Sequence, residues 1–573
     1  MSVSDLLVSG TGPGRADARV DVPAEARDLV AGLVADPWGQ VSASAYETGR
    51  LVSLAPWLSG HAGRVRFLLD TQRPDGTWGA PGGYALVPTL SATEALLAEL
   101  RRTGHDGTDP DGSPQGGDAE HRVPNPGVLA GATRRGLWAL ERWSGEGAER
   151  FPLPDMPAIE LIVPALISMI NARTGPAGER LGAPAGMDGA KLTAIRAWLA
   201  SGGTVPQKLL HALEVAGEAA VRAADVSPVP ISAAIFGDIG AMGAIGASPA
   251  AGAAWLGAEG PSDPADPVLR YLEEIADRTG GPVPCATPIT VFERGWALSW
   301  LLRAGVPVVV PPELTASLSG ALGPEGVAAG PGLPPDADTT SVALYTLVLL
   351  EAPLEPVGLW PYETDTHFCT WRGEEGASPT VNAHVLDAFG EHLRRGTGAE
   401  PRYVAAVRKL SAWLCGRQAA DGSWLDRWHA SPYYATACCA LALEDFGGEE
   451  SADAVRGAVG WVLGSQREDG SWGRWEGTAE ETAYALQILL LAGGQAGDGR
   501  CEEAVERGYR YLLGSVTDRG DPVDPRPLWH DKDLYFPAGI VRAAVLGALH
   551  LARRDTLPVC VPSPSPSRVA IAP

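Results

Sequence analysis

Apolar residues recur at helical spacing along most of the chain, as in segments 341–351 and 483–492, and turns containing Gly and Pro separate these runs. Strict alternation of apolar and polar residues, the pattern of a half-buried strand, is scarce. The pattern therefore predicts an all-helical protein. We expect a Gly-, Asp- and Pro-rich loop at 103–126 to be mobile and the Pro-Ser tail at 557–573 to be disordered.

One short motif occurs in three copies. Gln-x2-Asp-Gly-(Thr/Ser)-Trp stands at 72–78, 418–424 and 466–472, and each copy precedes a predicted helix that begins near a Thr-Ala or Ala-Thr pair. The Asp-Gly pair predicts a turn with positive φ. We expect the Trp to lie across neighbouring helix ends and the Gln to cap backbone groups. The repeat therefore predicts helical hairpins pinned side by side, as in a closed barrel of helix pairs, and a structural role.

Length, charge and cysteine content limit the classes of function that the chain can have. The 573 residues exceed a single ordinary core, which favours two or three domains. A formal net charge of −24 argues against nucleic acid as a partner. The seven cysteines include no Cys-x-x-Cys pair, which favours reduced thiols in a cytoplasmic protein. No secretory signal and no unbroken run of about 18 apolar residues are present, so we expect no membrane span. The sequence leaves a homodimer open.

Two aspartates one residue apart, Asp336 and Asp338, precede a predicted helix in the segment 336–340 (DADTT). Protonating an isolated alkene requires a strong acid in dry surroundings, and neighbouring carboxylates can share a proton and separate their pKa values. Two other interpretations exist. Asp336 could simply cap the helix. The pattern Asp-x-Asp-x-Thr also matches haloacid-dehalogenase phosphatases, but that motif follows an apolar strand, and residues 332–335 (GLPP) do not form one.

The repeats resemble the Gln-Trp motifs of triterpene and class II diterpene cyclases, and the likeness extends from about residue 42 to about 550. Further similar segments, in the same order as in plant class II cyclases, are 44–48 (SAYET), 159–166 (IELIVPAL), 209–214 (LLHALE), 283–285 (VPC) and 291–294 (VFER). The chain has no Asp-Asp pair, so it lacks the Asp-Asp-x-x-Asp motif of the family's metal-ionising domain.

The resemblance implies two α/α barrels with the substrate cavity between them. A β domain would consist of the N-terminal segment and first helix at 1–60 together with 305–556. A γ domain at 61–304 would be inserted into it.

In the class II family the acid motif is Asp-x-Asp-Asp, with the middle Asp as the proton donor. The resemblance therefore implies that Asp338 is the donor, that Asp336 orients and polarises it, and that Thr339 replaces the last Asp. The Asp-x-Asp-Thr-Thr variant resembles that of drimane-forming cyclases. We therefore expect conversion of farnesyl diphosphate to bicyclic drimenyl diphosphate, with the diphosphate retained. Geranylgeranyl diphosphate giving a copalyl-type product is the alternative. A non-catalytic helical-barrel binding subunit is the alternative from another class.

The resemblance also suggests partners for the diphosphate, the cation and the last proton. Mg²⁺ would neutralise the diphosphate, with Glu160 as a candidate ligand. His211 matches a His that, with an Asn, holds the proton-accepting water in plant copalyl enzymes, and Cys285 stands at the Asn position. Carbocations favour aromatic faces. The substrate-binding candidates are Lys208, Arg294 and Lys532 for phosphate, and Trp360, Phe368, Trp371, Trp428 and Tyr434 for the cation.

Overall fold

The computed structural model describes residues 20–105, 124–144, 152–175, 180–231, 241–396, 400–493 and 499–556. Helices dominate these residues, which confirms the all-helical prediction. Strand β1 (Val229–Pro230) pairs antiparallel with β2 (Gly243–Ala244), and β3 (Trp529–His530) pairs antiparallel with β4 (Leu534–Tyr535). No helix within the described ranges is long and apolar enough to cross a membrane. Most of the loop at 103–126 and all of the tail at 557–573 lie outside the described residues.

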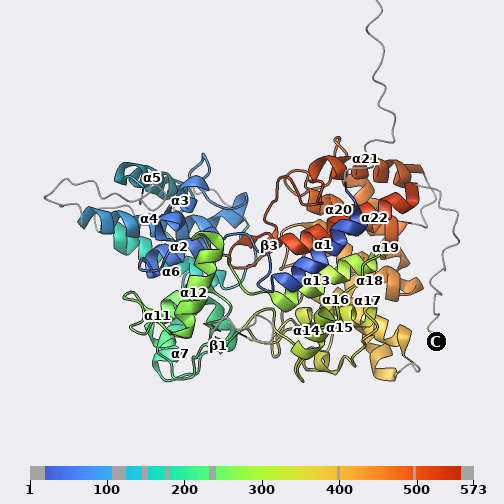
Figure 1. Ribbon diagram of the computed structural model, residues 1–573, viewed down its shortest axis with the longest axis horizontal. Coiled ribbons are helices and arrows are strands. Elements are labelled where there is room, and N and C mark those ends of the chain that lie inside the picture. The colour runs from blue at the N-terminus through green and yellow to red at the C-terminus, as the bar shows by residue number, and fades with distance from the viewer. Residues whose placement is uncertain are drawn as a thin grey trace, which may run out of the picture.

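The chain folds into two lobes, and the second is a closed ring of inner helices surrounded by outer ones (Figure 1). Each inner helix packs against the next, and the last packs against the first. In ring order these helices are α13 (Thr290–Arg303), α15 (Ala337–Leu349), α16 (Pro379–Arg395), α18 (Pro432–Phe446), α20 (Ala479–Leu491) and α22 (Ala538–Thr556). The outer elements are α1 (Val22–Ala35), α14 (Pro312–Ala321), η4 (Val357–Tyr362), α17 (Pro401–Arg417), η5 (Glu449–Ser451), α19 (Ala452–Ser465) and α21 (Gly499–Ser515).

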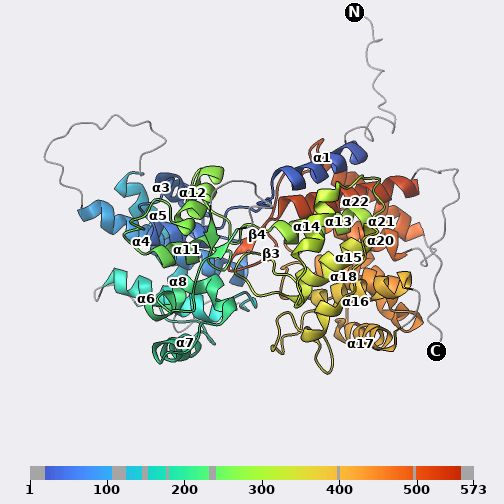
Figure 2. The same ribbon diagram turned by 60° about the horizontal axis from the view of Figure 1, so that its bottom comes forward.

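The first lobe repeats this plan with shorter helices. Its inner ring closes in the order α2 (Ala45–Leu54), α4 (Leu86–His105), α6 (Ile159–Thr174), α8 (Leu213–Ala216) and α11 (Pro249–Leu256). Around it lie α3 (His61–Asp70), η1 (Gly82–Ala85), α5 (Pro126–Arg142), α7 (Ala190–Ala200), η3 (Gln207–Ala212), α9 (Glu218–Val221) and α12 (Pro267–Thr279). The hairpin β3–β4, from the C-terminal part of the chain, lies between the two lobes (Figure 2).

The predicted domain boundaries at residues 61 and 305 need correction. Helix α2 packs against α3, α4 and α11, so it belongs to the first lobe and not to the second. Helix α13 packs against α15 and α22, and Trp296 and Leu301 from it enter the core of the second lobe. Burial of these apolar side chains assigns each helix to its lobe. The first lobe therefore begins before Ala45 and the second resumes before Thr290, while α1 packs on α22 as predicted for the first helix.

The repeats make the contacts that the sequence predicts. In the first copy Gln72 Nε2 donates to the carbonyl oxygens of Gly76, at 3.1 Å, and Ala132, at 2.9 Å. The indole of Trp78, which is fully buried, donates to the Leu68 carbonyl oxygen at 2.7 Å. The corresponding Gln and Trp of the other two copies make the same bonds to the turn glycine and to two neighbouring helices. Each repeat therefore fastens neighbouring helices together, which is a structural role.

Candidate active site

The aspartate motif forms the first turn of α15, an inner helix of the second lobe. Asp336 is the N-cap residue: Oδ1 accepts from the Thr339 N–H at 2.6 Å and Oδ2 accepts from the Thr339 hydroxyl at 3.0 Å. The Asp336 N–H donates to the Val327 carbonyl oxygen at 3.1 Å, and Thr340 Oγ1 accepts from the Val327 N–H at 2.9 Å. Asp336 therefore does cap the helix. The cap leaves Asp338 free to serve another purpose.

Asp338 is paired with a histidine from the next inner helix. Its Oδ1 lies 2.6 Å from Nδ1 of His384 on α16, and the two side chains are 14% and 9% exposed. Burial works against a charge on His384, but the adjacent Asp338 carboxylate raises the pKa of His384 well above its ordinary value. An imidazolium donating to Oδ1 would stabilise the carboxylate that remains if Asp338 gives up a proton. No other side chain of the described residues hydrogen-bonds to Oδ2, which is left to face a substrate.

The sequence analysis missed His384, because a single histidine within a buried helical segment carries no signal of its partner. His384 also borders a cavity inside the ring that reaches Arg303 and Asp387. These two form a bidentate ion pair with distances of 2.9 Å. An ion pair thus lies in the same cavity as the histidine partner of Asp338.

Asp336 has an unusual protonation equilibrium. Burial and the nearby negative charge of Asp338 raise its pKa to about 7, against the lowering effect of the hydrogen bonds from Thr339. Near neutral pH the Asp336 carboxyl group is therefore only partly ionised. This agrees with the expectation that the two aspartates interact.

Aromatic rings surround the acid pair. The Trp296 ring stands edge-on to His384 with centroids 5.4 Å apart, and its indole donates to the Tyr434 hydroxyl at 2.7 Å. Phe292 stacks on Trp296 at 4.2 Å, and Trp529 lies 4.8 Å from Tyr434. Tyr434 was among the predicted aromatic residues, whereas Phe292, Trp296 and Trp529 were not. Such faces can stabilise a carbocation next to the acid.

Trp360 and Phe368 are not cavity residues, contrary to the prediction. Phe368 is fully buried and packs against Phe389. Trp360 stacks on Phe389 at 4.8 Å, and the Arg402 guanidinium covers it at 3.6 Å. Both rings belong to the packing between η4, α16 and α17.

Trp371 and Trp428 lie at the end of the barrel that carries the acid. Their rings meet edge to face at 5.3 Å, and both are only partly buried. Thr370, which precedes Trp371, accepts through its carbonyl oxygen from the Ala337 N–H at 2.9 Å. These two tryptophans remain candidates for substrate contact.

The structure places the predicted phosphate-binding cations in different surroundings. Arg294 is 6% exposed and donates to the Leu33 carbonyl oxygen at 2.9 and 3.1 Å, so it ties α13 to α1 and does not reach a substrate. Lys208 is half exposed and forms an ion pair across the two lobes with Glu374. Lys208 therefore remains a candidate for a diphosphate contact.

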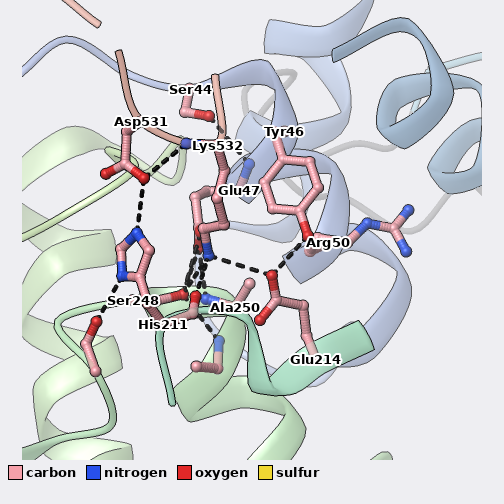
Figure 3. A network of polar contacts seen from close by, with 12 residues as sticks. Ser44, Tyr46, Glu47, Arg50, His211, Glu214, Ser248, Ala250, Asp531 and Lys532 are labelled. Atoms are coloured by element: carbon pink, nitrogen blue, oxygen red, sulfur yellow. Dashed lines mark hydrogen bonds and ion pairs between the residues drawn. The ribbon is translucent and has the colours of Figure 1, made fainter. Parts of the chain in front are cut away.

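Lys532 is not a phosphate ligand, because the structure buries it completely. It lies in the turn of the hairpin β3–β4, and its Nζ donates to the His211 carbonyl oxygen at 2.6 Å, to Ser248 Oγ at 2.9 Å and to Glu214 Oε1 at 3.2 Å (Figure 3). It also forms an ion pair with Glu47. A buried cation with this many partners anchors the turn of the second lobe's hairpin inside the first lobe.

Glu160 does not have the surroundings of a metal ligand. Its side chain is half exposed in the first turn of α6 and forms an ion pair with Lys191. Within the described ranges no group of three or more His, Cys, Asp or Glu side chains could hold a metal ion. The residues present therefore do not fit a protein-held Mg²⁺ at Glu160.

Comparison with known proteins identifies the family of this chain. Residues 375–526 match the model of the squalene-hopene cyclase C-terminal domain. The chain is 43% identical to the ent-copalyl diphosphate synthase of Streptomyces sp. (strain KO-3988), over 93% of this chain and 96% of that relative. It is 40% identical to the labda-7,13-dienyl diphosphate synthase of Streptomyces clavuligerus, over 94% of each.

A solved structure extends this likeness to the fold. The ent-copalyl diphosphate synthase from Streptomyces platensis superposes with a TM-score of 0.82 at 41% identity, covering 93% of this chain and 99% of that one. Both barrels and the region between them are thus shared. On these grounds the chain belongs to the class II terpene cyclases.

Proposed function

We propose that this protein cyclises geranylgeranyl diphosphate to a bicyclic, copalyl-type diphosphate, with Asp338 as the proton donor. The observation that carries the proposal is the Asp338–His384 pair, which lies beside aromatic rings and leaves one carboxyl oxygen without a hydrogen bond from the described residues. A non-catalytic binding subunit would have no use for such a pair. The prediction of a class II cyclase from the sequence therefore leads to the same site as the geometry does.

The chemistry follows from the environment of Asp338. Protonated Asp338 gives its proton to the terminal double bond, and the two ring closures pass the positive charge along the chain. The imidazolium of His384 stabilises the carboxylate that forms, and the electron-rich rings of Trp296 and Tyr434 lie close by, where they favour a nearby cation. Loss of a proton then ends the reaction. The diphosphate leaves the site still attached to the product.

The choice of a C20 substrate rests on the relatives. Copalyl and labda-7,13-dienyl diphosphates are both bicyclic C20 compounds, and proteins named for making them are 40–43% identical to this chain. The prediction of farnesyl diphosphate rested on the Thr339-Thr340 variant alone, and these relatives do not support it. The acid geometry itself does not depend on the length of the substrate.

A product assay tests the proposal. The purified chain is incubated separately with geranylgeranyl and farnesyl diphosphates, and the products are dephosphorylated and identified by gas chromatography with mass spectrometry. We expect a bicyclic C20 alcohol from the first substrate and little turnover of the second. A C15 drimane alcohol as the main product would show that farnesyl diphosphate is the substrate instead. Absence of any bicyclic product from either substrate would reject the cyclase assignment.

Three further expectations from the sequence remain predictions. Mg²⁺ would act as a counter-ion of the substrate diphosphate, and the same assay with and without the ion measures its effect. The cytoplasmic location and the homodimer remain predictions as well.

A further inference from the structure

Hydrogen bonds and ion pairs to residues of the first lobe hold the turn of the hairpin β3–β4 (Figure 3). Lys532 at its centre has no exposed surface and binds partners from α2, α8, η3 and the start of α11. On one side of it Asp533 accepts from the Tyr46 N–H at 3.2 Å and from the Ser44 hydroxyl at 3.3 Å. The residue on the other side, Asp531, therefore has a fixed position at the junction of the two lobes.

His211 contacts Asp531, and both of its ring nitrogens face acceptors. Nδ1 lies 2.6 Å from the Gly246 carbonyl oxygen, and Nε2 lies 2.7 Å from Oδ1 of Asp531. A carbonyl oxygen and an ionised carboxylate can only accept, so both nitrogens must carry a proton. His211 is therefore an imidazolium with no lone pair to take another proton. His211 was expected to help hold a proton-accepting water, but both of its ring nitrogens are engaged by Gly246 and Asp531.

The protonation states of the two partners agree with this assignment. Burial works against both charges, but the carboxylate of Asp531 raises the pKa of His211 above its ordinary value. Conversely, the charges of His211 and Lys532 and their hydrogen bonds lower the pKa of Asp531 to about 2, against the effect of burial. Asp531 is thus a carboxylate at any ordinary pH.

The two carboxylate oxygens of Asp531 differ in their contacts among the described residues. Oδ1 accepts from His211 and from the Lys532 N–H, the latter at 2.6 Å. For Oδ2 the contacts among the described residues include no nitrogen or hydroxyl donor, and Figure 3 shows it pointing away from the network. The Asp531 side chain is 11% exposed, and the thiol of Cys285 is a hydrogen-bond partner of the same carboxylate.

Asp531 and Asp338 have a common neighbour, Tyr535. Tyr535, on strand β4, lies within electrostatic reach of both: burial raises its pKa well above the ordinary value, and the nearby negative charges of Asp531 and Asp338 add to that effect, as would that of an ionised Cys285. The ring of Tyr535 also lies 6.3 Å from that of Trp529, which is one of the aromatic rings around the acid pair. Tyr535 and Trp529 thus connect the surroundings of Asp531 with those of the acid pair.

We propose that Asp531 takes the proton that the cyclised cation loses, and that His211 is a positioning residue that orients it. This inference rests on the proposed cyclase function. In the step, a C–H bond next to the cationic carbon breaks, its electron pair forms the C=C bond, and the proton goes to Oδ2 of Asp531. Asp338 has supplied one proton and Asp531 receives one, so the overall reaction is an isomerisation. The proton on Asp531 then passes to solvent.

A weakly basic carboxylate is suited to this step. A tertiary carbocation is a far stronger acid than any carboxylic acid, so the step does not need a group with a high pKa. What matters is a negative charge that is fixed close to the C–H bond and that draws the positive charge towards it. The network of Lys532 and His211 provides that fixed position. Cys285, where plant copalyl enzymes carry an Asn, leaves the carboxylate as the stronger acceptor at this place.

The test compares products from Asp531→Asn and His211→Gln. Asn cannot accept the proton, so we expect Asp531→Asn still to consume substrate but to form the wild-type alkene about 10²-fold more slowly or worse, with isomeric alkenes or water-captured alcohols instead. Gln at position 211 can still donate to Oδ1, so we expect the wild-type alkene at a reduced rate. The matched control is Asp533→Asn, which removes a buried carboxylate from the same turn and should leave the product unchanged.

The opposite pattern would overturn the inference. If Asp531→Asn gives the wild-type alkene in unchanged proportion, or if His211→Gln alone alters the product, Asp531 is not the acceptor. Should Asp531→Asn fail to fold, nitrogen-15 NMR of histidine-labelled wild type provides a second test, with the His211 signals assigned by their loss in His211→Gln. We expect both nitrogens of His211 to be protonated at pH 8. A neutral ring there would contradict the proposal.

A failure of the Asp531 proposal can be distinguished from a failure of the proposed cyclase function. The variants are compared on whichever prenyl diphosphate the wild type cyclises, so a C15 product would change the substrate assignment and leave the test of Asp531 intact. The NMR measurement needs no substrate at all. It therefore decides the protonation of His211 even if neither diphosphate is turned over.

Discussion

Two buried Asp–His pairs, one inside the second lobe and one where the hairpin β3–β4 meets the first lobe, have nearly the same separation. Asp338 lies 2.6 Å from His384, and Asp531 lies 2.7 Å from His211. Each histidine has its pKa raised by its partner, against the effect of burial. Distance alone therefore gives no reason for one aspartate to release a proton and the other to accept one.

The surrounding charges make the difference. Beside Asp338 stands a second carboxyl group, Asp336, whose pKa is raised to about 7, so protons are retained there at neutral pH. Beside Asp531 stand His211 and Lys532, which lower its pKa to about 2. One pair is thus set in an environment that keeps a proton available, and the other in one that keeps a negative charge. The comparison shows that the same pair of residue types can have opposite roles when its neighbours differ.

The largest effect should come from Asp338→Asn. An amide of the same shape cannot donate a proton to an alkene, so we expect kcat to fall about 10³-fold or more. Product formation over long incubations measures this, and circular dichroism shows whether the barrel is retained. A folded Asp338→Asn variant that cyclises at the wild-type rate would remove Asp338 from the donor role.

Removing Lys532 should mainly affect stability. Lys532→Met leaves Glu47 and Glu214 buried without their cation, which we expect to cost about 3–5 kcal/mol in the free energy of unfolding. Denaturant titration measures this. The triple variant Lys532→Met, Glu47→Gln, Glu214→Gln removes all three charges and should recover most of the loss. If the single variant is as stable as the wild type, the buried network does not anchor the hairpin.

Replacing His384 should weaken the acid without abolishing it. Gln keeps a hydrogen-bond donor near Oδ1 of Asp338 but not the positive charge, so we expect His384→Gln to lower kcat about 10- to 100-fold with little change in KM. Steady-state kinetics measures both constants. An unchanged kcat would mean that the charge of His384 does not strengthen the acid.

Asp336 should give the protein a pH-dependent stability. Its folded-state pKa of about 7 lies above that of an unfolded aspartate, so its contribution to stability is present at low pH and is lost as the pH rises through about 4 to 7. The full effect is at most about 4 kcal/mol. Asp336→Asn cannot ionise, so its free energy of unfolding should fall less than that of the wild type between pH 5 and pH 8. Parallel curves for the two proteins would contradict the raised pKa.

The smallest effect should come from Trp360, which packs outside the cavity. We expect Trp360→Phe to keep kcat and the product mixture close to wild type. Trp296→Phe, which loses the indole bond to Tyr434 and part of the ring face beside His384, should lower kcat about fivefold. Kinetics of the two variants side by side measures the contrast. If Trp360→Phe loses more kcat than Trp296→Phe, the cation lies nearer to Trp360 than to Trp296.

The sequence predicted the parts of this molecule that local patterns encode. The Gln-Trp repeats specify their own turns and their contacts to adjacent helices, so the barrel of helix pairs could be inferred from them. Asp336 and Asp338 are neighbours in the chain, and their interaction could be inferred as well. In each case the interacting residues are close in sequence or repeat in a fixed order.

What the sequence could not predict are pairings between distant segments. His384 is 46 positions after Asp338, and Asp531 is 320 positions after His211. Lys532 looks like a surface cation until the fold buries it among carboxylates from the other lobe. Among many tryptophans, only the packing of the helices decides that Trp296 faces the acid while Trp360 faces the outer layer.

The central claim, that Asp338 starts the reaction by protonation and the diphosphate is kept, can be tested in deuterated water. Wild-type protein equilibrated in D₂O should give a bicyclic diphosphate that is one mass unit heavier, with the deuterium at the carbon that Asp338 protonates and with no release of inorganic diphosphate. Asp338→Asn should give no labelled product. An unlabelled cyclic product, or release of inorganic diphosphate in step with cyclisation, would contradict the account.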